Sequence, residues 1–138
     1  VLLLRGAKDK RIWAGLYNGV GGHVEQGEDM YTAALRELEE ETGISGIPLS
    51  LSAVIHVDTE MGTGVQIAVF RAEAVNESVK ASHEGDLHWI PVDGISQHPL
   101  VSDLYQLIPL IAKWREGNPV LCGLSRKVGD KWVIRFAS

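Results

Sequence analysis

Three carboxylates are predicted to lie on one face of a single short helix. Glu37, Glu40 and Glu41 are spaced by three and four residues, as neighbours on a helix surface are. Like charges at this spacing repel by about 0.2–0.5 kcal/mol per pair, and the C-terminal end of a helix favours cations. Arg36 is the one obvious partner within the helix. A bound divalent cation would offset this local cost; the alternative interpretation is a solvated acidic face.

The type of ligand indicates the type of metal. Carboxylate oxygens are hard ligands that suit Mg²⁺, with Mn²⁺ as the alternative, rather than zinc. Mg²⁺ usually keeps several waters and takes further ligands from substrate phosphates. We therefore expect metal and a phosphorylated substrate to bind together.

Capping residues define the ends of this helix. Asp29 is a suitable N-cap for a helix from Met30 to Thr42, and Gly43 is placed as its C′ residue. Before the helix, two adjacent glycines permit positive φ and a close approach of the backbone to a ligand. The residues expected to face the core, leaving the three glutamates to point outward together, are Met30, Ala33, Ala34 and Leu38.

The whole segment from residue 22 to residue 44 has a defined spacing. From Gly22 it runs Gly, five residues, Glu, seven residues, Arg-Glu-Leu, one residue, Glu-Glu, one residue and Gly-Ile, ending at Ile44. This resembles the signature of the Nudix hydrolases at every defined position. The resemblance implies metal-dependent hydrolysis of a phosphoanhydride in a nucleoside diphosphate derivative.

The resemblance also implies a role for each matching side chain. Arg36 belongs with the catalytic residues, and Glu28 supports the metal ligands. The alternative for these two residues is a structural salt bridge, which is compatible with those roles. The residues that the resemblance places at the metal are Gly22, Glu37, Glu40 and Glu41.

Removal of a proton from the attacking water needs a carboxylate close to it. Glu41 is one candidate. Glu84 is the other, because an acidic residue just before a Trp-containing strand resembles a position that several Nudix enzymes use; its alternative is an exposed loop carboxylate. The five histidines have no visible partner and are interpreted as surface or packing residues, although His23, beside Gly22, is also a candidate for substrate binding.

Two further residues suggest a substrate. Residues 13–23 resemble the lead-in of the MutT-like, oxidised purine nucleoside triphosphatases, in which an Asn at the position of Asn18 reads the base. Residues 99–105 resemble the segment that carries an acidic base-reading residue, here Asp103, although Leu100 and Ser102 depart from that pattern. The structural alternatives are a turn residue for Asn18 and a helix cap for Asp103.

Other substrates and other functions stay open. The Pro and Tyr markers of ADP-ribose pyrophosphatases and dinucleoside polyphosphate hydrolases are missing around residues 59–63. The favoured substrate is therefore a purine nucleoside triphosphate, oxidised or not, and the alternative is ADP-ribose or another nucleotide sugar or dinucleotide. A non-catalytic nucleotide sensor of the same fold is less favoured, because every motif glutamate is retained.

The 138 residues, 45% of them hydrophobic, fit a single Nudix domain over residues 1–138. The expected fold is α/β, a Nudix-type α/β/α sandwich with a central mixed sheet. We expect a further N-terminal strand to precede Val1, because the chain opens inside an apparent strand. The other expected elements are strands at 1–5, 49–58, 65–75 and 87–91, a helix at 102–115 that Pro109 kinks or delays, and a hairpin of 120–128 with 131–136.

Charge and cysteine content indicate the kind of binding partner and the cellular compartment. A net charge of −5 disfavours a nucleic-acid binder. The single cysteine, Cys122, fits a reducing compartment and is expected to be a small core residue. The sequence shows no membrane span and no signal peptide, so we expect a cytoplasmic protein that acts on a small nucleotide. The resemblance leaves room for a homodimer.

Overall fold

The computed structural model describes residues 1–6, 15–59, 62–80 and 85–137. They form two compact units: Val1–Leu49 with Ala72–Val101, and Ser50–Arg71 with Ser102–Ser138. The expectation of one domain over residues 1–138 stays a prediction. In the described residues, no helix combines the length and the apolar character that crossing a membrane requires.

The first unit contains a three-stranded antiparallel sheet and the glutamate-bearing helix. The sheet has the order β2-β1-β5, with β1 in the centre. Leu3 and Leu4 on β1 are both buried, and they point to opposite faces of the sheet. The elements of this unit are β1 (Leu2–Gly6), β2 (Tyr17–Asn18), α1 (Met30–Thr42), β5 (Gly85–Trp89) and the short 3-10 helix η1 (Val92–Gln97).

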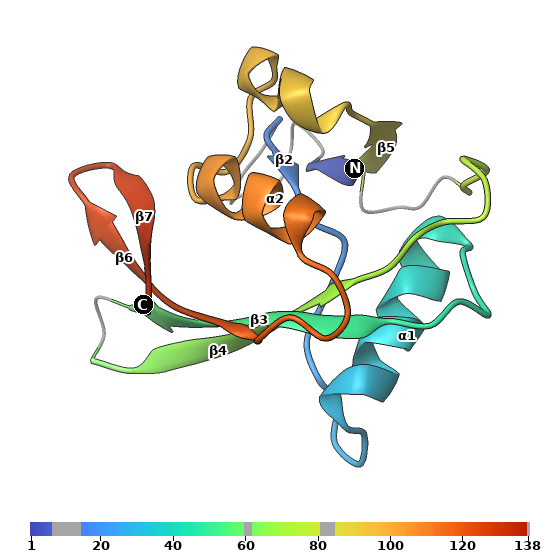
Figure 1. The fold of residues 1–138 in the computed structure, drawn as a ribbon, viewed down its shortest axis with the longest axis horizontal. Coiled ribbons are helices and arrows are strands. Elements are labelled where there is room, and N and C mark those ends of the chain that lie inside the picture. The colour runs from blue at the N-terminus through green and yellow to red at the C-terminus, as the bar shows by residue number, and fades with distance from the viewer. Residues whose placement is uncertain (7–14, 60–61, 81–84, 138) are drawn as a thin grey trace. The chain divides into compact units, whose positions relative to one another are not determined.

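Helix α1 begins and ends where its capping residues predict (Figure 1). The Asp29 carboxylate accepts a hydrogen bond from the Thr32 backbone N–H at 2.9 Å. Gly43 has a φ of 77° and donates its N–H to the Glu39 carbonyl, as a left-handed C′ residue does. Met30 was expected in the core, but it is 47% exposed because it lies in the first turn, ahead of the buried Ala33.

The second unit is built on a four-stranded mixed sheet with the order β4-β3-β6-β7, drawn as two long twisted hairpins in Figure 1. Strands β3 and β6 are parallel, and the other pairs are antiparallel. Ala53, Ile55 and Ile134 are buried in it. Its elements are β3 (Ser50–Asp58), β4 (Gly64–Arg71), α2 (Leu104–Lys113), β6 (Leu121–Val128) and β7 (Lys131–Phe136).

Helix α2 is fixed to strand β7 by side-chain hydrogen bonds to the backbone. Gln106 accepts from the Ile134 N–H at 3.0 Å and donates to the Ile134 carbonyl at 3.2 Å. Ser102 accepts from the Trp132 N–H at 2.9 Å. The helix begins at Leu104, two residues later than predicted, and Pro109 lies inside it.

The predicted strands and hairpin are present, with ends shifted by a few residues, and the mixed sheet is confirmed. The expectation for Cys122 was wrong, since its side chain is exposed. Residues of a strand point alternately to opposite faces, and Cys122 shares its face with the exposed Arg126 rather than with the buried Ser125. Neither β2 nor η1 was predicted, because each is too short for a periodic pattern to emerge.

Candidate active site

Arg36 is the centre of the candidate site. Its guanidinium forms a two-point contact with Glu28, from Nη2 at 2.7 Å and from Nε at 3.1 Å. Nη1 contacts Glu37 at 2.8 Å and Glu40 at 3.2 Å, and Nη2 donates to the His23 carbonyl at 3.1 Å. One planar cation therefore ties the loop before α1 to the carboxylates on α1, which is the geometry that the arginine fork favours.

Glu28 completes this support. Its carboxylate accepts the Glu25 backbone N–H at 2.7 Å as well as the two Arg36 donors. The hydrogen bonds from Arg36, and then that from Glu25, lower the pKa of Glu28 below its ordinary value of 4.5. The same contacts with Glu28 and Glu37 raise the pKa of Arg36. The salt bridge considered from sequence is therefore present, and it lies in the position from which Arg36 holds two motif glutamates.

The loop before α1 approaches the helix closely at Gly22, which explains why this position needs a glycine. A Cβ at Gly22 would lie 2.3 Å from the Glu37 Oε1 and 2.4 Å from its carboxyl carbon. Gly21 donates its N–H toward the Glu41 Oε2 at 3.4 Å. Neither glycine is among those with positive φ, so space at Gly22, rather than backbone conformation, is the requirement.

The three glutamates do not face outward together as expected. The Glu40 side chain is 59% exposed, but that of Glu37 is 16% exposed and Glu41 is buried at 8%. The sequence shows that they share a helix face, but it does not show that the Gly21–Gly22 loop lies against this face. The loop covers two of the three carboxylates.

The donor set fits a hard divalent cation. The Glu37 carboxylate lies so close to Gly22 that an added Cβ would overlap it, and carboxylate oxygens are the donors that hard divalent cations prefer. In the described part of the chain, no three acidic, His or Cys side chains converge closely enough to hold an ion. Arg36 contacts both Glu37 and Glu40, so an ion held by these residues and Glu41 would compete with it for their oxygens.

The two candidate substrate residues lie in different units. Asn18 is on β2, and its Oδ1 accepts the Gly19 N–H at 2.8 Å. Asp103 occupies the N-cap position of α2. Burial raises the pKa of the Asp103 carboxyl.

The backbone of Tyr17, next to Asn18, pairs with residues 99 and 101, at the start of the segment that contains Asp103. Tyr17 donates to the Pro99 carbonyl at 2.8 Å and accepts from the Val101 N–H at 3.0 Å. The buried Tyr17 ring also meets His88 and His98 edge-on, at 5.6 and 5.7 Å between centroids, and Arg5 lies 5.6 Å from it. No sequence signal indicated that Tyr17 would make these contacts, because β2 has only two residues.

The remaining candidates are placed as follows. Glu84 lies outside the described residues. The His23 side chain is exposed, and its backbone carbonyl is the part that contacts Arg36. Three histidines have partners that are not visible in the sequence. His56 lies 3.2 Å from Asp58 and 2.9 Å from Gln66, and His88 and His98 contact the Tyr17 ring.

Lowering the pH is expected to remove the stabilisation that Glu28 provides. A carboxylate with a lowered pKa in the folded state stabilises the fold above its unfolded pKa, and this contribution is lost as the pH falls through the folded value. The difference in urea midpoint between wild type and Glu28→Gln should be full at pH 7 and should shrink below pH 4.5. In an Arg36→Gln background the pH dependence of this difference should be much weaker. A difference that stays constant from pH 7 to pH 3 in the wild-type background would contradict this role.

The chain is similar in sequence to known proteins. Residues 1–111 match the family model described as the NUDIX domain. The chain is 33% identical over 112 residues to an oxidized purine nucleoside triphosphate hydrolase of Mus musculus, covering 79% of this chain and 70% of the relative. A Danio rerio protein of the same description is 31% identical over 113 residues, with the same coverage of both chains.

Solved structures share the fold. A MutT protein from Bacillus halodurans superposes with a TM-score of 0.80 at 23% identity, covering 99% of this chain and 88% of that one. The NUDIX domain of Shewanella oneidensis NrtR, crystallised with ADP ribose, gives a TM-score of 0.69 at 21% identity, covering 82% and 75%. The expected Nudix-type α/β fold is thereby confirmed. The motif, the family match and the relatives agree, and the chain belongs to the Nudix family of pyrophosphohydrolases.

Proposed function

We propose that this chain hydrolyses a purine nucleoside triphosphate, with oxidised purines preferred, to the monophosphate and pyrophosphate. The observation that carries this proposal is the close contact between the Gly21–Gly22 loop and two motif carboxylates. Glu37 lies against Gly22, and Glu41 accepts from the Gly21 N–H. Such a loop can bring backbone N–H groups and carboxylates to the phosphates of one substrate.

The side chains of the site are proposed to have different roles. Nudix hydrolases use divalent metal ions, and we propose Mg²⁺, or Mn²⁺, held by Glu37, Glu40 and Glu41 beside Gly22. The ion, when bound, neutralises phosphate charge and orients the attacking water. Arg36 holds Glu37 and Glu40 in place, and Glu28 holds Arg36.

Glu41 is proposed as the general base that accepts the proton of the water. It is the most buried of the three glutamates, and the Gly21 N–H lies 3.4 Å from its Oε2. A fixed carboxylate within reach of the water is what proton removal requires. Glu84 remains the alternative base.

We propose Asn18 and Asp103 as base-contacting residues, each from the resemblance of its own segment, and His23 as a residue near the phosphates. The amide of Asn18 offers a donor and an acceptor to a purine edge. Burial raises the pKa of the Asp103 carboxyl. The mouse and zebrafish relatives, described as oxidized purine nucleoside triphosphate hydrolases, support this substrate class.

A substrate panel tests the proposal. The protein would be incubated with Mg²⁺ or with chelator and with the common nucleoside triphosphates, 8-oxo-dGTP, ADP-ribose and a dinucleoside polyphosphate, and the products separated by chromatography. Pyrophosphate release from purine triphosphates, strongest with 8-oxo-dGTP and absent with chelator, is expected. Cleavage confined to ADP-ribose, the ligand in the NrtR complex, would show that a purine nucleoside triphosphate is not the substrate. Binding without any metal-dependent turnover would favour the sensor alternative.

Replacing Asp103 with Asn is expected to change the preference among bases and to stabilise the fold. The preference for 8-oxo-dGTP over dGTP in kcat/KM should fall by about 10-fold, the effect of roughly one hydrogen bond to the base. Because burial penalises the Asp103 charge, the neutral Asn should raise the thermal midpoint at pH 7. Asp93→Asn, at an exposed position of η1, serves as the control. An unchanged preference would remove Asp103 from the base site.

Three further features belong to the proposal. We propose that residues 1–138 act as a single Nudix domain, that the protein acts in the cytoplasm on a small nucleotide without nucleic acid or membrane, and that it can form a homodimer. The single cysteine and the acidic net charge of −5 support a reducing compartment and a small-molecule substrate.

A further inference from the structure

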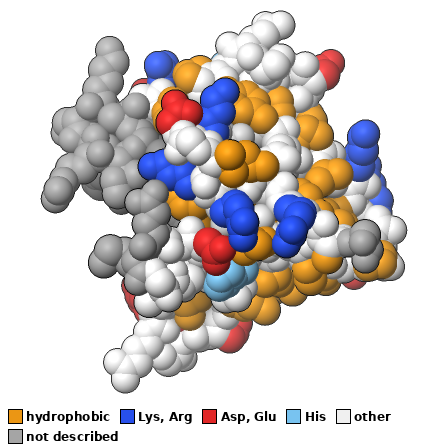
Figure 2. Space-filling model, turned by 90° about the vertical axis from the view of Figure 1, so that its left-hand side faces the viewer, with side chains coloured by type: hydrophobic (Ala, Val, Ile, Leu, Met, Phe, Trp, Pro, Cys, Tyr) orange, Lys and Arg blue, Asp and Glu red, His pale blue; other side chains and the backbone are white. Residues whose placement is uncertain are grey.

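Positive charge is concentrated on the hairpin of β6 and β7. Residues 121–136 contain four basic residues and one acidic residue, so the hairpin carries +3 within a chain whose net charge is −5. Figure 2 shows a face of the protein on which Lys and Arg side chains lie among exposed hydrophobic ones. The overall composition does not explain this local excess of positive charge.

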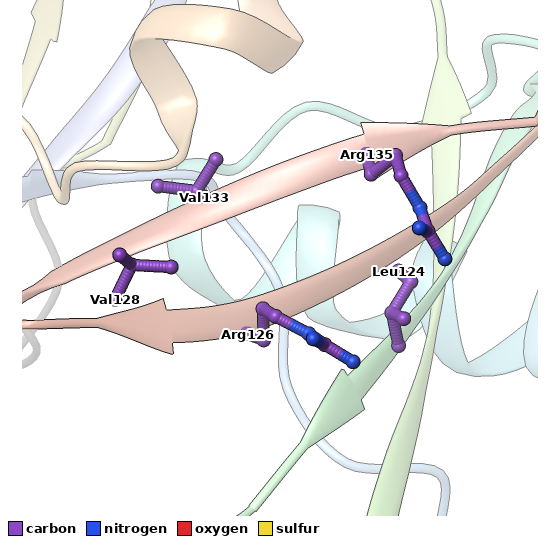
Figure 3. A pocket seen from close by; sticks show the side chains of 5 residues that line it. All are labelled: Leu124, Arg126, Val128, Val133 and Arg135. Atoms are coloured by element: carbon purple, nitrogen blue, oxygen red, sulfur yellow. The ribbon is translucent and has the colours of Figure 1, made fainter.

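Two of these cations lie on neighbouring strands and on the same face. Strand pairing places Leu124 opposite Arg135 and Arg126 opposite Val133. Arg126 and Arg135 are therefore diagonal neighbours, a distance across which long side chains interact. Figure 3 shows both side chains extending along the same side of the hairpin. Their like charges repel, so the pair is unfavourable unless an anion lies between or beside them.

Acidic side chains of the protein neutralise the positive charge of Arg126 and Arg135 only in part. Arg126 Nη2 lies 3.7 Å from the Asp58 carboxylate, with both side chains about half exposed. The other Asp58 oxygen is 3.2 Å from His56. Among the described residues, Arg135 has no ion pair. Positive charge therefore remains available on this face.

The two arginines border a small hollow. Its volume is about 100 Å³, and it is lined by Arg126, Arg135 and three aliphatic side chains, Leu124, Val128 and Val133. A whole nucleotide needs roughly 300 Å³ or more. The hollow is smaller than that, which suits one compact anionic group.

From this arrangement we propose that β6 and β7 form a second anion site, which binds one phosphate group of a soluble phosphoanion. The arginine fork matches the tetrahedral oxygens of phosphate, and two arginines can bind it from adjacent strands. All five lining residues come from the hairpin itself. The site needs none of the motif glutamates and no metal.

Titration calorimetry with inorganic pyrophosphate tests the site, in chelator so that no metal-dependent binding contributes. We expect one equivalent to bind, and the double variant Arg126→Gln/Arg135→Gln to bind at least about 10-fold more weakly. The matched control is Lys113→Gln/Lys127→Gln, which removes two exposed charges, one from α2 and one from the hairpin outside the hollow. It should bind as wild type does. Arg135→Lys, which keeps the charge but loses the fork, should be intermediate.

The results that would contradict the second anion site differ from those that would contradict the proposed hydrolase function. No binding by wild type, equal weakening in the control variant, or binding only to phosphatidate vesicles would overturn the site. Circular dichroism would verify that the double variant folds, and Arg135→Lys provides the test if it does not. Turnover in Mg²⁺ should be retained in the double variant, so loss of this site and loss of catalysis can be told apart.

Discussion

Replacing Glu41 with Gln is expected to reduce kcat by at least about 10²-fold, since general base catalysis contributes about 10²–10⁴-fold. The amide has nearly the shape of the carboxylate but cannot accept the proton, and it is a weaker ligand for a hard cation. The Gly21 N–H could still donate to the amide oxygen, so the loop should keep its place. The measurement is steady-state turnover of the best panel substrate, with the thermal midpoint recorded in parallel.

Glu39→Gln is the matched control for this experiment. Glu39 lies two residues away on the same helix, carries the same charge and is exposed. Its removal changes the net charge equally, and turnover should remain within about twofold, as expected of an exposed position outside the site. If Glu41→Gln retained turnover while folded, the base would have to be Glu84 or another group, and the metal role of Glu41 would also fail.

Replacing Gly22 with Ala is expected to cost about 10²-fold in kcat/KM without unfolding the protein. The added Cβ would lie 2.3 Å from the Glu37 Oε1, so either the loop or the Glu37 carboxylate must move by about an ångström. Misplacement of that size at a catalytic site can cost about 10²-fold. The Arg36 contact with Glu37, 2.8 Å in the native arrangement, should be disturbed as well.

Gly21→Ala provides a sharp comparison, because it is the adjacent glycine in the same loop. A Cβ at Gly21 meets no described heavy atom within 4 Å, and Gly21 does not need positive φ. Its activity should stay close to that of wild type. Equal losses in the two variants would show that loop flexibility, rather than the contact of Gly22 with Glu37, limits the reaction.

Both experiments address the same physical point, which is that the site is assembled by contacts between the loop and α1. Arg36 connects Glu28, the His23 carbonyl, Glu37 and Glu40. A cation that is fixed at two points on Glu28 cannot follow one glutamate without disturbing the others. We therefore expect changes in this segment to couple non-additively.

Local sequence determined the helix that carries the site. The ends of α1 depend on Asp29 and Gly43, whose capping interactions are made within the helix or directly beside it. The contact between Arg36 and Glu40 is likewise set by a spacing of four residues. The β6–β7 hairpin depends on the two-residue turn at Gly129 and Asp130. All of these interactions are local in the chain, so their patterns are visible in the sequence.

The tertiary structure decided which of these groups meet. The burial of Glu41, the tight fit of Gly22 against Glu37 and the pairing of Tyr17 with residues 99–101 join segments separated by 15 to 84 residues. The exposure of Cys122 and the joint placement of Arg126 and Arg135 follow from strand pairing. Sequence periodicity reports which side of an element a residue occupies, whereas burial and contact depend on what covers that side. The sequence by itself thus determined the family, the helix and the charged groups of the site, and only the folded chain decided how far each group is exposed and which partner holds it.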